Sequence, residues 1–225
     1  MNMLCQSDEL LIIGDSFCAD RSRIQDWPKH LLKLATGSDG IPRGMGWPGA
    51  SWWSTRNTLF NEFRIKMPKI LIICHTEPMR IPSDYHFGLN AGSATGKFPI
   101  CSPIENELYY SDDVKTAAAM YYKHLMSDNF HWWANDRWYK ELDTLLLANH
   151  QIQVIHLKSF EIRNCFRSGI TSKEILSTLC PNKGPSNHFT FDQNLQIAKS
   201  LYKTLCGQIE FQFETGCEYN LGLLK

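Results

Sequence analysis

Three short runs of aliphatic residues constrain the fold of this chain more than any other feature. They read ELLIIG at residues 9–14, KILIIC at residues 69–74 and QIQVIHL at residues 151–157. Runs of this length with little polar interruption predict strands that are buried on both faces. Segments with helical periodicity lie between them, and that alternation predicts a parallel sheet covered by helices on both sides.

The remaining segments give the other expected elements of a single domain covering residues 1–225. Helices are expected at residues 24–35, 52–63, 114–126, 132–149 and 192–206. A short helix is expected at residues 171–179, because Thr171 and Glu174 match a capping box. Residues 40–49 read as a loop with a possible short strand near its start, and the alternation at 208–213 predicts an edge strand. A loop and helical insertion is expected at about 78–149.

Composition excludes several classes of function. The formal net charge is +0, whereas a nucleic-acid partner would require a basic excess. No segment reaches the roughly 20 apolar residues of a membrane span. The N-terminus lacks a basic region, and Asp8 and Glu9 interrupt its apolar run, so no signal peptide and a cytoplasmic location are expected. The 8 cysteines form no C-x-x-C pair and the 8 histidines no H-E-x-x-H motif, so we expect neither a metal site nor a cofactor.

The first aliphatic run ends in Gly-Asp-Ser, which places Ser16 directly after a strand. Ligands of open parallel sheets bind beyond the carboxyl ends of the strands, so Ser16 is expected at that edge. A serine on such a turn can offer its oxygen as a nucleophile and its backbone N–H to an oxyanion. The same tripeptide is also ordinary turn chemistry, with Asp15 or Ser16 as a cap.

The chain resembles the SGNH (GDSL-type) hydrolases in two blocks. LLIIGDSFCAD is similar to the first block of that family, and NHFTFDQNLQIAKSLY is similar to its last block. The style of the first block is similar to SGNH-like proteins of bacteriophages and environmental bacteria. The resemblance implies a flavodoxin-like three-layer α/β/α sandwich with a central, mostly parallel sheet. It also implies that Ser16 is the nucleophile and His188 its base.

The middle blocks of the family are matched less closely. The resemblance implies an oxyanion-binding glycine, for which PGAS at residues 48–51 proposes Gly49, with Gly44 and Gly46 as alternatives. The family's third block supplies an Asn, but here the strand KILIIC continues into His75 and Thr76, either of which can donate a hydrogen bond. The Asp that the family places three residues before its His is replaced by Pro185. A Ser–His dyad is therefore expected, with a backbone carbonyl as one way to orient the ring.

Several further side chains are candidates for contact with a substrate. They are Asp15 beside the nucleophile, Trp52 beside the oxyanion loop, and Arg80 after a strand end, where a surface salt bridge is the alternative. Trp132, Trp133 and Trp138 cannot all lie on one side of a helix. One or two are expected at the surface, where a ring can stack on a sugar or anchor a partner, while core packing is the alternative.

These features together predict a serine esterase that removes a small acyl group, such as acetyl, from a small-molecule or carbohydrate ester. Two alternatives stay open. A catalytically degenerate SGNH fold could bind carbohydrate or protein, because the Asn and Asp of the family blocks are missing. An O-acyltransferase could use the same dyad with an alcohol acceptor.

Overall fold

Within the residues that it describes, the computed structural model forms a six-stranded sheet in the order β2-β1-β3-β4-β5-β6. These residues are 3–19, 26–46, 50–80, 112–125, 127–162, 166–176, 189–208 and 213–214. The strands are β1 (Leu10–Ala19), β2 (Arg43–Gly46), β3 (Ile70–His75), β4 (Gln153–Lys158), β5 (Ile170–Ile175) and β6 (Phe213–Glu214). The first five are parallel and β6 is antiparallel, which confirms the expected α/β architecture.

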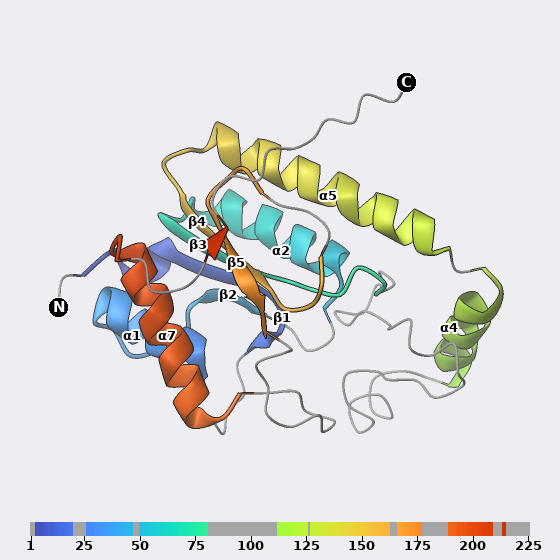
Figure 1. The fold of residues 1–225 in the computed structure, drawn as a ribbon, viewed down its shortest axis with the longest axis horizontal. Helices are drawn as coiled ribbons and strands as arrows, with labels where there is room; N and C mark the ends of the chain where they lie inside the picture. Colours follow the sequence, from blue (N-terminus) through green and yellow to red (C-terminus); the bar gives the residue numbers. More distant parts are fainter. Residues whose placement is uncertain are drawn as a thin grey trace.

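Helices cover both faces of this sheet (Figure 1). The covering helices are α1 (Trp27–Thr36), α2 (Trp52–Ile65), α5 (Asp128–Ala148) and α7 (Phe191–Leu205), whereas α4 (Asp112–His124) lies to the side of the sheet. A 3-10 turn, η1 (Ser7–Glu9), precedes β1. α1 and α7 pack together on one face, while α2 and α5 lie on the other (Figure 1). The structure is therefore the three-layer sandwich that the sequence predicts.

The aliphatic run of β1 explains why both faces are covered. Leu10 and Ile12 belong to the apolar cluster beneath α1 and α7, whereas Leu11 and Ile13 belong to the cluster beneath α2 and α5. All four side chains are completely buried. Burial of one such side chain stabilises a fold by about 1.5–3 kcal/mol, so a strand without polar alternation is stable only between two helical layers.

Two glycines let the strands beside β1 approach its carboxyl end. Gly14 has a φ of 143°, and a Cβ atom there would overlap the carbonyl oxygen of Cys74 on β3. A Cβ atom on Gly46 of β2 would overlap the carbonyl oxygen of Asp15. This close packing accounts for Gly46, one of the two alternative oxyanion glycines, without any catalytic role.

The predicted helix at residues 171–179 is wrong, because residues 170–175 form β5. Thr171 and Ser172 are buried there, and Ile155 and His156 of β4 pair with Ile170 and Thr171. β-branched residues suit a strand, and the pairing with β4 overrides the local capping pattern. The predicted edge strand at 208–213 is described only at its end, where Phe213 pairs antiparallel with Ser172.

The insertion between β3 and β4 contributes α4 and α5 to the described residues. Leu142 and Leu146 of α5 enter the core beside Leu59 of α2, so the helical half of the insertion covers one face of the sheet as expected. The loop predicted at residues 84–105 lies outside the described residues. Among the residues described, no helix combines the length and apolar character required to span a bilayer.

Candidate active site

Ser16 lies where β1 leaves the regular ladder. Gly14 and Ala19 both pair with Gly46 of β2, so the residues between them bulge away from that neighbour. The pairing of β1 with β3 ends at Gly14. Ser16 is half-buried between fully buried neighbours, and no hydrogen bond among the described residues engages its hydroxyl. The order 2-1-3 makes this edge the topological switch point at which ligands of such sheets bind.

Asp15 shapes the turn that presents Ser16. The backbone N–H of Phe17 and the hydroxyl of Ser159 donate to its Oδ1 at 3.0 and 3.1 Å. The other oxygen, Oδ2, has no hydrogen-bond partner and lies 3.8 Å from Nη1 of Arg80. Burial raises the pKa of Asp15 to about 6, although the charge of Arg80 opposes the shift. Asp15 was a candidate substrate contact, but its complete burial makes it an internal support of the turn.

Arg80 and Thr76 hold the segment that enters α2. Both donate to the carbonyl oxygen of Ala50, from Nη1 of Arg80 at 3.0 Å and from the Thr76 hydroxyl at 2.8 Å. The Arg80 guanidinium also lies 5.0 Å from the centre of the Phe160 ring. Arg80 is 1% exposed, so it is an interior cation rather than the surface ion pair that the sequence left open.

His75 is part of a buried pair of histidines. Its Nε2 lies 2.9 Å from Nδ1 of His156, and Nε2 of His156 lies 2.7 Å from the carbonyl oxygen of Ser168. A carbonyl only accepts, so His156 donates through Nε2 and accepts from His75 through Nδ1. Burial lowers the pKa of His156 to about 4 and that of His75 well below its usual range. His75 is therefore neutral, and its one N–H is used within the pair.

His188 and Gly49 lie outside the described residues. Phe189, which directly follows His188 in the chain, is described and buried. The ring of Phe189 packs against the ring of Phe17 with a centroid separation of 5.6 Å. Asn194 of α7 accepts from the backbone N–H of Trp27, and the indole N–H of Trp27 donates to the carbonyl of Phe17. The residues that follow Ser16 and His188 in the chain are thus in direct contact.

Some contributors to this edge were missed by the sequence analysis. Ser159 follows β4 directly, so its position after a predicted strand was a usable signal. Asn194 and His156 carried no such signal in the sequence. A polar residue within a helix or strand has the same sequence pattern whether its side chain supports a site or faces solvent. Asn194 also donates to the carbonyls of Phe189 and Thr190 and so fixes the chain entering α7.

Trp52, the first residue of α2, connects this edge to an aromatic cleft between α2 and α5. Its indole N–H is buried and has no hydrogen-bond partner, and the same is true of the Tyr139 hydroxyl and the Asn135 amide on α5. Unpartnered buried polar groups are uncommon in proteins. Burial raises the pKa of Tyr139 above its ordinary value.

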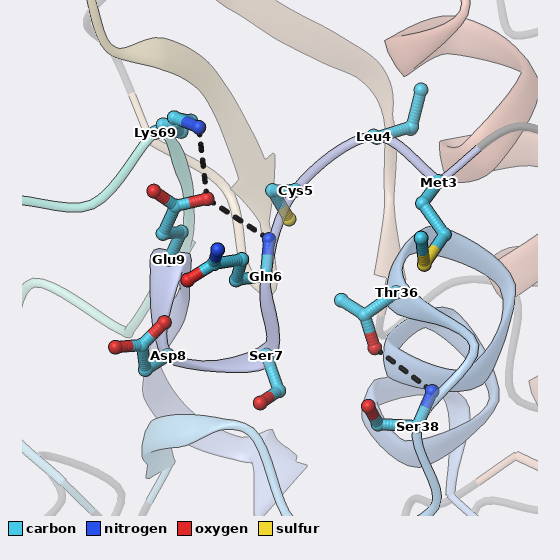
Figure 2. A pocket seen from close by; sticks show the side chains of 10 residues that line it. All are labelled: Met3, Leu4, Cys5, Gln6, Ser7, Asp8, Glu9, Thr36, Ser38 and Lys69. Carbon is cyan, nitrogen blue, oxygen red and sulfur yellow. Dashed lines mark hydrogen bonds and ion pairs between the residues drawn. The ribbon is translucent and has the colours of Figure 1, made fainter.

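A second pocket, of about 680 Å³, lies at the opposite edge of the sheet (Figure 2). Its acidic groups are already engaged, because Glu9 accepts from the backbone of Gln6 and pairs with Lys69 at 3.0 Å. Burial raises the pKa of Cys5 there to about 11, which leaves the thiol protonated and unreactive. Neither Cys5 nor Glu9 is therefore poised for catalysis in this pocket.

Within the described parts of the chain, no group of three or more His, Cys, Asp or Glu side chains is arranged to hold a metal ion. Comparisons of the chain with protein-family models, curated proteins and solved structures found no match.

Proposed function

We propose that the protein hydrolyses carboxylic esters with Ser16 as nucleophile and His188 as general base. The main support is the contact between Phe17 and Phe189, because each ring directly follows one of the two proposed catalytic residues. Consecutive Cα atoms are about 3.8 Å apart, so that contact brings the first and last blocks of the chain to the same sheet edge.

In the proposed reaction, the Ser16 oxygen attacks the acyl carbon while His188 takes the hydroxyl proton. The tetrahedral intermediate breaks at the bond to the alcohol oxygen, and the alcohol leaves with the proton from His188. Water then attacks the acyl-serine while His188 takes one of its protons. The bond between the acyl carbon and the Ser16 oxygen breaks, His188 returns the proton to that oxygen, and the carboxylic acid is released. The backbone N–H groups of Ser16 and Gly49 are the proposed donors to the oxyanion.

Neither Thr76 nor His75 has a free proton to serve as a third donor to the oxyanion. The proton of Thr76 is used by the Ala50 carbonyl, and that of His75 by His156. Neither contact supports a role as oxyanion donor. The hydrolase is therefore expected to depend on backbone donors.

We expect Thr76→Val to leave kcat/KM for p-nitrophenyl acetate within about threefold of the original, because Arg80 still holds the Ala50 carbonyl. Loss of a working oxyanion donor costs about 10²–10³ in rate. Steady-state kinetics of the variant separate the two cases. A loss of that larger size would assign the Thr76 hydroxyl to the oxyanion.

The second candidate is a carbohydrate- or protein-binding module without catalysis. The engaged protons of Thr76 and His75 favour it. A fluorophosphonate probe distinguishes the two functions, since it phosphonylates only an activated serine. We expect labelling of Ser16, mapped by peptide mass spectrometry, and no labelling of the exposed Ser7 at the other sheet edge. Labelling that is absent, or that also occurs after heat denaturation, would favour the binding module.

A further inference from the structure

The cleft between α2 and α5 has a volume of about 440 Å³. Aromatic side chains form much of its wall, and they come from α2, α4 and the first half of α5. They are Trp52, Trp53, Tyr121, Phe130, Trp133 and Trp138. Trp138 is buried in the core, whereas Trp53, Phe130 and Trp133 are 41%, 56% and 55% exposed. Exposed aromatic rings gathered in one concave surface mark a binding site more often than core packing.

Charged groups also line the cleft, and they are largely neutralised in place. Arg56 forms a two-pronged ion pair with Glu141, with N–O distances of 2.9 and 2.6 Å, and its guanidinium stacks over Trp53. The guanidinium of Arg137 lies 5.7 Å from the ring of Trp133. The cleft thus presents flat apolar faces bordered by polar groups of both signs.

These properties restrict the ligand. A lipid chain would cover the Arg137 guanidinium without satisfying its hydrogen bonds, which is costly. A nucleic acid would find little net positive charge, because Arg56 is already paired with Glu141. A quaternary ammonium would face two arginines. A neutral sugar chain suits these groups, because its ring C–H faces pack on the exposed indole rings and its hydroxyls bond to the charged side chains.

The cleft also adjoins the Ser16 edge. Trp52 is two residues from Ala50, whose carbonyl binds Arg80 and Thr76. Two residues of chain span at most about 7 Å. At the other wall, Trp138 of the cleft floor precedes Tyr139, whose ring lies 5.0 Å from that of His75. The cleft and the Ser16 edge therefore adjoin the same elements, α2 and the carboxyl end of β3.

We propose that the aromatic cleft binds a neutral oligosaccharide and that esters on sugar hydroxyls are the substrate class of the Ser16 site. The second half of this inference rests on the proposed ester hydrolysis. The first half does not, because sugar binding requires no reactive serine. A proline-rich peptide also binds aromatic grooves, but it offers amides rather than esters to the site.

The test is calorimetric titration of the Ser16→Ala protein with cellohexaose, xylohexaose and chitohexaose, none of which carries an O-linked ester. We expect at least one to bind with a dissociation constant below about 1 mM. Trp133→Ala should weaken that binding about tenfold or more, and Trp133→Phe should retain most of it, because the ring face is kept. Leu147→Ala, at an exposed position on the same helix, should change nothing.

Absence of binding by all three sugars at about 10 mM would overturn the proposal, as would equal binding by Trp133→Ala. Tighter binding of decaproline or of a ten-residue oligothymidine, with the same dependence on Trp133, would assign the cleft to that ligand instead. Turnover of p-nitrophenyl acetate by the original protein is measured in parallel. Sugar binding without turnover would refute only the proposed ester hydrolysis. Turnover without sugar binding would refute only the proposed binding of oligosaccharide in the cleft.

Discussion

Replacing Ser16 with alanine is expected to lower kcat/KM for p-nitrophenyl acetate by at least about 10³-fold, because the variant has no oxygen to form the acyl-enzyme. The same loss is expected for His188→Ala, and the double variant should be little worse than either single one. Residues that act as one unit give such non-additive losses. The fold should persist in Ser16→Ala, since no hydrogen bond among the described residues depends on that hydroxyl.

The matched controls are the exposed residues Ser7 and His150, each replaced by alanine. Ser7 lies at the opposite edge of the sheet (Figure 2), so its loss should leave turnover unchanged. The pH profile adds a second readout, because catalysis through a histidine base requires its neutral form and should fall as pH drops through its pKa. Ser16→Ala turnover within tenfold of the original would refute the nucleophile assignment, whatever the pH profile.

Much of the fold could be predicted because the strands are buried on both faces. Leu10–Ile13 and the matching runs in β3 and β4 leave no polar face, and that pattern specifies a central parallel strand almost regardless of context. β5 could not be recognised in the same way. Buried Thr171 and Ser172 interrupt its apolar character, and Thr171 with Glu174 imitates a helix cap. Only the pairing with β4 decides the conformation.

The candidate site was predictable in position but not in its internal contacts. The topology places Ser16, His75 and Thr76 at one edge, because Ser16 lies just past the paired part of β1, His75 ends β3 and Thr76 follows it. The N–H of His75 is engaged by His156, which is 81 positions away in the chain, so the local sequence does not show that this proton is unavailable. The role of Arg80 likewise depends on Asp15 and Ala50, and no local pattern identifies an arginine as buried.

Arg80→Gln is expected to destabilise the protein by about 3–5 kcal/mol at pH 7, because it leaves the Asp15 carboxylate buried without a cation. Glutamine can still donate to the Ala50 carbonyl, but it loses the stacking of the guanidinium over Phe160 as well as the charge. Arg56→Gln is the matched control. Its partner Glu141 is exposed, and such a pair contributes less than about 1 kcal/mol. Urea unfolding of both variants gives the two free energies.

The pH dependence identifies Asp15 as the cause. Its pKa is about 6 in the folded protein against an ordinary value of 3.8, so between these values the folded state holds a proton that the unfolded state has lost. Stability from this group is therefore complete below about pH 4 and falls by about 3 kcal/mol as pH rises through 6. Without Arg80, the folded pKa should rise further, and the fall should become larger.

The penalty of Arg80→Gln should consequently be smaller by about 1 kcal/mol at pH 4.5 than at pH 7, because pH 7 lies about one unit above the folded pKa of Asp15 and one unit corresponds to about 1.4 kcal/mol. Adding Asp15→Asn should restore at least about 2 kcal/mol at pH 7, since asparagine keeps an oxygen for Phe17 and Ser159 but carries no charge. An equal penalty at both pH values, or no recovery in the double variant, would show that Arg80 stabilises the turn through its hydrogen bond to Ala50 alone. The turn that carries Ser16 would then be stabilised by the hydrogen bond of Arg80 to Ala50, before α2, and not by the charge interaction of Arg80 with Asp15.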